Sequence, residues 1–162
     1  MNTRRKRLRF FFGVITALLL LLIFSRSAKT ASESSAESTW VLELVKRLIP
    51  GVGMKLIRKL AHFTEYFILG VLLWLDCCLL QKSRWILPLG VGLAVASADE
   101  FFQTFIPGRS GQLTDVLIDG SGVLFAVALL YLLAWARRRK KAARTQKTAC
   151  EAAASGTVDR PQ

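Results

Sequence analysis

The sequence VLIDGSGVLFAVALLYLLAWA, from Val116 to Ala136, contains one charged residue, Asp119, and none in its second half. A helix in a soluble bundle would repeat polar residues every three or four positions. A bilayer core instead accepts about 20 mainly apolar residues per helix. The stretch therefore predicts a membrane-spanning helix, which we assign to Leu113–Trp135.

Three further apolar blocks are long enough to span a bilayer: Leu8–Phe24, Leu60–Leu80 and Trp85–Phe105. The 162-residue chain is 52% hydrophobic yet carries a net charge of +12, because basic residues gather between and beyond the blocks. This segregation predicts an all-α, polytopic membrane protein with four transmembrane helices. The first block also resembles a signal peptide, but the sequence after it offers no good small-x-small cleavage site. We expect a retained signal anchor at residues 10–24.

Basic residues predict the orientation in the plasma membrane. Residues 1–9 hold five of them, the link between the second and third blocks holds Lys82 and Arg84, and RRRKK begins at Arg137. Because cytoplasmic segments carry the excess of Lys and Arg, we expect both termini to be cytoplasmic. A basic arm would occupy residues 1–9, and a basic, disordered tail residues 136–162. Beside a transmembrane helix, such a tail suits anionic headgroups, so the expected partner is the bilayer and not nucleic acid.

Residues 25–59 would then lie outside the cell. They begin as a flexible linker and continue as WVLELVKRLI, from Trp40 to Ile49. Helical spacing separates the apolar side chains of this segment from Glu43, Lys46 and Arg47, and Pro50 follows it. We expect an amphipathic helix that lies along the membrane interface. Packing onto the bundle is the alternative.

Polar side chains gather at one end of the last three spans. They are His62, Glu65, Asp99, Glu100, Gln103, Arg109, Asp115 and Asp119. Asp99 lies six residues before Phe105, which at about 1.5 Å per residue is roughly 9 Å from the end of its span. Since a charge at the centre of a spanning helix costs about 3 kcal/mol, these groups are expected to face inward, around a wet cavity open to the outside.

Structural roles are open for several of these residues. Asp115 can complement the dipole at a helix start, Arg109 can neutralise a carboxylate, and His62 can donate a hydrogen bond between helices. Asp76, near the opposite ends of the spans, is expected to stand alone.

Two segments carry a family resemblance: RKLAHFTEYFILG, from Arg58 to Gly70, and DEFFQTFIPGRSGQLTDVLIDGSG, from Asp99 to Gly122. In residue type and order they resemble the VanZ-like family, which is named for a membrane protein associated with resistance to the glycopeptide antibiotic teicoplanin. The resemblance implies a three-helix VanZ-like core at residues 60–135. It also places all eight polar residues named above in the family pattern.

Three functions fit these features. The first is a cell-envelope factor whose outward site binds a phosphate headgroup or a lipid-linked wall precursor. The second is a membrane-embedded, metal-dependent hydrolase, since one histidine with several carboxylates can hold a divalent ion that activates water. The third is a small transport or regulatory subunit linked to protons or cations. The sequence identifies no catalytic residue, cofactor or metal.

Overall fold

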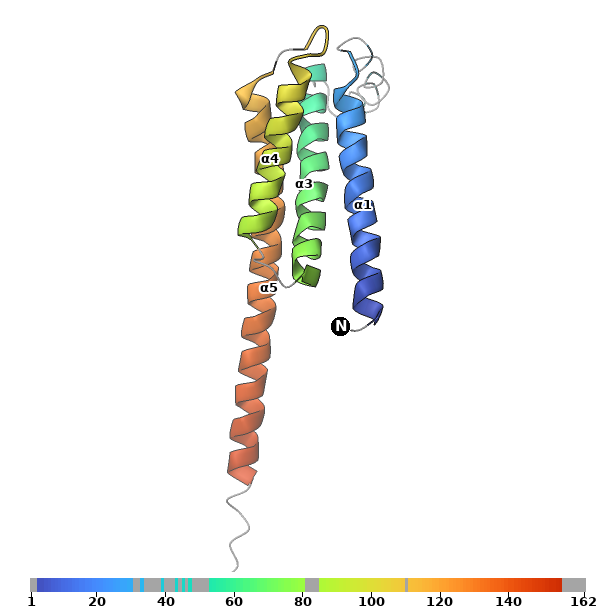
Figure 1. Ribbon diagram of the computed structural model, residues 1–162. Coiled ribbons are helices and arrows are strands. Elements are labelled where there is room, and N and C mark those ends of the chain that lie inside the picture. Colours follow the sequence, from blue (N-terminus) through green and yellow to red (C-terminus); the bar gives the residue numbers. More distant parts are fainter. Residues whose placement is uncertain are drawn as a thin grey trace, which may run out of the picture. The chain divides into compact units, whose positions relative to one another are not determined.

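The computed structural model describes residues 3–30, 53–80, 85–109 and 111–155, together with the isolated positions 33, 39, 43, 45 and 47. Across these residues it has four long helices: α1 (Thr3–Ser27), α3 (Met54–Leu80), α4 (Ile86–Gln103) and α5 (Leu113–Ser155) (Figure 1). Each is long and apolar enough to cross a membrane. The prediction of an all-α chain with four spans is confirmed at this level.

Helix α3 begins six residues earlier than the second predicted span, at Met54, and α1 includes both the basic arm and Ser25–Ser27. Lys and Arg are good helix formers, so flanking basic residues continue a helix that the apolar block has started. The predicted amphipathic helix at Trp40–Ile49 lies outside the described residues, except for three isolated positions, and stays a prediction.

Helix α5 continues to Ser155, into the tail that was expected to be disordered, and the assignment of residues 136–162 as a separate disordered tail stays a prediction. The segment is rich in Ala, Arg and Lys, which have high helix propensity, and adding residues to an existing helix avoids the cost of nucleation. Residues Met1–Ala128 and Leu129–Gln162 form two separate compact units. The helix bundle described below belongs to the first unit.

Within the bundle, α1 and α3 run in opposite directions. Near one end, the guanidinium of Arg5 donates to the Cys78 carbonyl at 3.4 Å. At the other end, Arg26 of α1 forms an ion pair with Glu65 of α3. Asp76 does not stand alone as expected, because the Thr16 hydroxyl donates to its carboxylate at 2.8 Å. Contacts between α1 and the other helices cannot be predicted from the sequence of each span taken separately.

Small residues bring α3 and α5 into close contact. A Cβ atom added to Gly122 of α5 would lie 2.6 Å from the Phe63 carbonyl oxygen and 3.1 Å from the Phe67 nitrogen. A Cβ atom at Gly70 of α3 would lie 3.1 Å from the Val123 Cα atom. Such backbone-to-backbone packing is typical of small residues between membrane helices.

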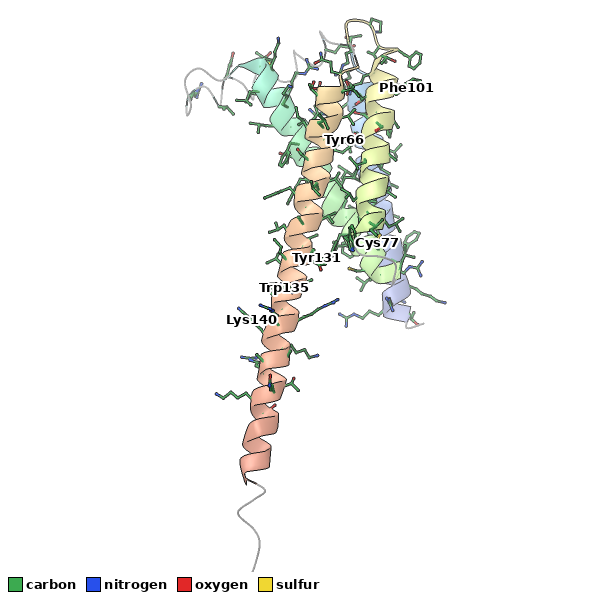
Figure 2. All side chains as sticks on the ribbon, turned by 90° about the vertical axis from the view of Figure 1, so that its left-hand side faces the viewer. Tyr66, Cys77, Phe101, Tyr131, Trp135 and Lys140 are labelled. Atoms are coloured by element: carbon green, nitrogen blue, oxygen red, sulfur yellow. The ribbon has the colours of Figure 1, made fainter. Side chains whose placement is uncertain are left out.

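The burial pattern is the reverse of that in a soluble protein. Phe10 is 77% exposed and Phe101 is 67% exposed, and Phe101 points away from the bundle in Figure 2. In contrast, Asp99 is 0% exposed and Asp119 is 1% exposed. Water-soluble proteins rarely expose so much contiguous apolar surface. A bilayer around the described helices would cover these exposed aromatic side chains.

We expect Gly122→Ala to destabilise the bundle by about 1–3 kcal/mol, because the added methyl group meets α3 backbone that cannot rotate away. Gly90→Ala is the matched control: it also adds one methyl group to a helix, but nothing lies within 4 Å of it. Thermal unfolding of the detergent-solubilised protein measures both changes. Equal melting temperatures for the two variants would contradict the close α3–α5 packing.

Candidate functional site

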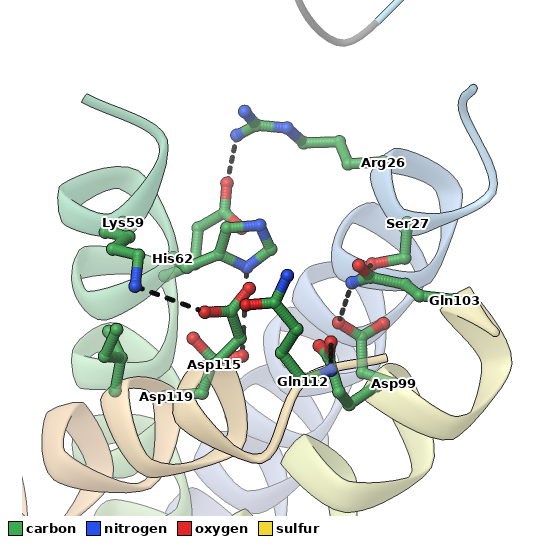
Figure 3. Close-up of polar contacts among 12 residues, drawn as sticks. Arg26, Ser27, Lys59, His62, Asp99, Gln103, Gln112, Asp115 and Asp119 are labelled. Atoms are coloured by element: carbon green, nitrogen blue, oxygen red, sulfur yellow. Dashed lines mark hydrogen bonds and ion pairs between the residues drawn. The ribbon is translucent and has the colours of Figure 1, made fainter. Parts of the chain in front are cut away.

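The polar end of the bundle is the end where α1 and α4 finish and α3 and α5 begin. Figure 3 shows that its side chains come from all four of these helices and from the loop before α5. Arg26 and Ser27 come from α1, Lys59 and His62 from α3, and Asp99 from α4. This arrangement follows from the alternating directions of the helices, which bring four helix ends together.

A cavity of about 350 Å³ opens among these side chains. The eight residues singled out from the sequence divide around it. Six of them line the cavity: His62, Glu100, Gln103, Arg109, Asp115 and Asp119. Glu65 and Asp99 do not line it. The inward-facing arrangement expected from the cost of charge in a bilayer therefore describes most of the set, and the other two carboxylates have different surroundings.

Glu65 and Asp99 are tied to α1. Glu65 forms the ion pair with Arg26. The carboxylate of Asp99 accepts a hydrogen bond from the Gln103 amide at 3.1 Å, and the same amide lies 3.2 Å from the Ser27 hydroxyl oxygen, its second acceptor. The sequence analysis missed Arg26 and Ser27, because both were assigned to the external linker. Extending the first helix by one turn would have brought them to the level of the polar residues.

Three basic residues of α3 also line the cavity: Lys55, Arg58 and Lys59. They were expected in the external loop, where they counted only toward orientation. With His62 they occupy positions i, i+3, i+4 and i+7, which share one face of a helix. Lys59 lies 3.5 Å from a carboxylate oxygen of Asp115. This helical spacing could have predicted that the three basic residues lie on the same side of α3 as His62.

Arg109 lies in the loop between α4 and α5. The preceding Gly108 has a φ of 77°, a left-handed conformation that favours glycine. The Arg109 Nε and Nη1 atoms are buried, and no described residue accepts a hydrogen bond from them. Burial lowers the pKa of Arg109, and the positive charge of Arg58 lowers it further. Two buried donors of a cavity-lining residue are thus left without an acceptor in the described part of the chain.

Glu100 fixes the start of α5. One of its carboxylate oxygens accepts the Gln112 backbone N–H at 2.7 Å, one residue before the helix begins. Gly111 lets the two segments approach, because a Cβ atom there would lie 3.1 Å from the Glu100 carbonyl oxygen. Helix starts have free N–H groups that bind carboxylates well. Glu100 therefore positions the α5 residues as well as lining the cavity.

His62, Asp99 and Asp119 converge at the cavity, which His62 and Asp119 line. Each offers one nitrogen or oxygen atom, and these atoms all lie within 4.8 Å of one another. The His62 Nδ1 atom is 3.8 Å from an Asp119 carboxylate oxygen, too far for a hydrogen bond. Nδ1 of His62 and Oδ1 of each aspartate are buried without a hydrogen-bond partner among the described residues.

The chain was compared with known protein families, curated proteins and solved structures. The VanZ/LLP1 family model matches residues 12–134, which is more than half of the chain. The chain belongs to the VanZ/LLP1 family. No curated protein and no solved structure matches it. Together with its four helices of spanning length, the family match makes the chain a multi-pass membrane protein.

The VanZ/LLP1 match extends beyond the two segments that carry the sequence resemblance. It begins at residue 12, inside α1, and ends at residue 134, inside α5. The first helix therefore belongs to the VanZ/LLP1 unit, although the resemblance alone placed only residues 60–135 there. This agrees with the contacts that α1 makes to Glu65 and Asp76. The polar end lies wholly within the matched range.

Proposed function

We propose that this VanZ/LLP1 protein binds the phosphate of a membrane-anchored headgroup in a site that faces the outside of the cell. The ligand is an ordinary anionic phospholipid or a lipid-linked precursor of the cell wall, which share this chemistry. By holding such a headgroup the protein would alter the envelope surface on which teicoplanin acts. We include in this proposal that headgroup binding by the protein contributes to tolerance of teicoplanin.

The buried guanidinium of Arg109 carries the proposal. Arg109 lines the cavity, and its buried Nε and Nη1 atoms have no acceptor among the described residues. An unpaired buried donor costs about 1–3 kcal/mol, and more when it is charged. A phosphate group offers several oxygens to a guanidinium, which can bind two of them at once. Because burial and Arg58 both lower the pKa of Arg109, an anion between the two guanidinium groups would relieve both effects.

The remaining cavity residues suit a phosphorylated headgroup that also carries hydroxyl or amino groups. Lys55 and Arg58 add positive charge on the α3 side. Glu100 of α4 and Asp115 of α5 add carboxylates, which can accept from hydroxyl or ammonium groups. A cavity for phosphate alone would have little use for these carboxylates. The mixed charge therefore favours a ligand with a phosphate and a polar, donor-bearing remainder.

The proposed orientation follows from the basic ends of the chain. Five basic residues lie in residues 1–9, and RRRKK begins at Arg137. With both segments in the cytoplasm, the end of the bundle that holds Arg109 faces outward. The amphipathic segment Trp40–Ile49 would then lie along the outer membrane interface beside the cavity mouth. A headgroup in the outer leaflet would reach the site from the side.

Arg109→Ala should weaken binding of the phosphate headgroup by about tenfold or more, since a hydrogen bond to a charged group contributes about 1.5–3 kcal/mol. Arg109→Lys should restore only part of this binding, because lysine lacks the planar guanidinium that can bind two phosphate oxygens at once. Binding is measured in detergent micelles doped with either an anionic phospholipid or a lipid-linked pyrophosphate. Stronger binding of one lipid identifies the source of the phosphate.

The control is Arg144→Ala, which removes the same charge outside the cavity lining and should bind as the wild type does. Unchanged binding by Arg109→Ala of both lipids would reject the proposed site.

Reporters fused to the chain test the orientation. A reporter after Gln162 and another in the QKSR link at residues 81–84 should both read as cytoplasmic, because these segments are basic. A reporter inserted at Ser35 should read as external. A C-terminal reporter that reads as external would reject the outward site, since the cavity would then face the cytoplasm.

A further inference from the structure

We propose that His62, Asp99 and Asp119 bind a divalent transition-metal ion inside the bundle. Two of these residues, His62 and Asp119, line the same cavity as Arg109, but the proposal concerns their convergence with Asp99 and not the phosphate-binding guanidinium groups. It therefore goes beyond the proposed function and does not depend on it.

The three side chains converge from three different helices. His62 belongs to α3, Asp99 to α4 and Asp119 to α5. One ligand atom from each lies within 4.8 Å of the other two. Ligand distances to Zn²⁺ are about 2.0–2.2 Å, so a bound ion would draw these atoms closer together. The contact between α3 and α5 at Gly122 sets their spacing one turn away.

Two of these groups are buried carboxylates, and each has one oxygen without a partner among the described residues. Asp99 is 0% exposed and Asp119 is 1% exposed. In each of them the Oδ1 atom has no hydrogen-bond partner in the part of the chain that the structure describes, and neither does Nδ1 of His62. Each of the three converging residues thus has one polar atom without a partner among the described residues. Buried polar groups are normally satisfied, and exceptions call for a partner that protein atoms do not supply.

Charge pairing leaves the two aspartates without a direct Lys or Arg partner among the described residues. Arg26 pairs with Glu65, and Lys59 pairs with Asp115. In the described residues, no Lys or Arg lies within ion-pair distance of Asp99 or Asp119. Two carboxylates at close range cannot both stay ionised without a nearby positive charge. A divalent cation between them would supply it.

The donor set indicates which ion fits. One imidazole nitrogen and two carboxylate oxygens suit Zn²⁺ and Mn²⁺, whereas Ca²⁺ and Mg²⁺ prefer oxygen ligands throughout. Three protein ligands leave coordination positions for water or for an oxygen of a ligand in the cavity. Such an ion is also what the alternative of a metal-dependent hydrolase requires.

Basic residues near the cluster repel a cation, and this repulsion has to be compared with the attraction of the carboxylates. Arg58 and Arg109 line the cavity, but neither forms an ion pair with Asp99 or Asp119 among the described residues. Glu100 and Asp115 line the same cavity and offset their charge. The cluster itself combines two carboxylates with one histidine, so a cation gains more from its direct ligands than it loses to the guanidinium groups.

Binding of Mn²⁺ to the full-length, detergent-solubilised protein tests the proposal. Mn²⁺ avoids the thiolates of Cys77 and Cys78, and electron paramagnetic resonance separates free from bound ion. After treatment with a chelator, the wild type should take up a single ion. Asp119→Asn should bind at least about tenfold more weakly, since even outer-sphere partners of a metal site change affinity by about 10–100-fold. Asp99→Asn should behave in the same way.

Asp76→Asn is the matched control, because it makes the same change at the opposite end of the bundle, where the Thr16 hydroxyl donates to the carboxylate. It should bind Mn²⁺ as the wild type does. Added Mn²⁺ should raise the melting temperature of the wild type and of Asp76→Asn but not that of Asp119→Asn. If Asp99→Asn fails to fold, the comparison of Asp76→Asn with Asp119→Asn still decides whether the ion binds at this cluster.

Equal Mn²⁺ binding by Asp76→Asn and Asp119→Asn would overturn the proposal. So would a wild type that binds no ion and melts at the same temperature with and without Mn²⁺, because protons would then neutralise the pair. No lipid headgroup is present in this experiment. Its failure is therefore distinct from failure of phosphate binding at Arg109.

Discussion

A carboxylate inside a bilayer needs a partner within the protein, and the bundle is arranged around that constraint. Asp99 and Asp119 are almost completely buried, and both belong to helices whose outer surfaces are apolar. A charge facing lipid would cost about 3 kcal/mol on insertion scales and more by other estimates. The faces of α4 and α5 that carry these residues therefore point into the bundle. This requirement fixes the rotation of each helix about its own axis.

The first helix completes the polar end even though its own span is apolar. Arg26 compensates Glu65, and the Ser27 hydroxyl accepts from the Gln103 amide, which also donates to Asp99. At the opposite end, Thr16 donates to Asp76. Helix α1 thus supplies partners at both ends of the bundle. A membrane helix that contacts polar groups of its neighbours is held by those hydrogen bonds as well as by packing.

The number of spans and the identity of the polar residues could be predicted from the sequence, because both follow from residue type and spacing. Which carboxylate meets which partner could not, since this depends on contacts between distant helices. Glu65 and Asp119 were expected at one depth around one cavity, yet Glu65 pairs with Arg26 while Asp119 lies near His62. The contribution of Lys55 and Arg58 was missed because the predicted span began too late, at Leu60. Hydropathy places the boundary of a span at the first charged residues. The helical backbone continues past that boundary.

The polar end is proposed to be a functional site and not only a device for packing helices. Glu100→Gln separates these two roles, because the amide keeps the shape of the side chain and can still accept the Gln112 N–H. The proposed teicoplanin tolerance of cells that express the protein and its melting temperature are measured together for this variant, with Asp76→Asn at the opposite end as control. If the site is functional, Glu100→Gln should lose the tolerance that the wild type confers while it melts within a few degrees of the wild type, and the control should keep both. Tolerance that survives the substitution, or that falls only in step with stability, would contradict a functional site.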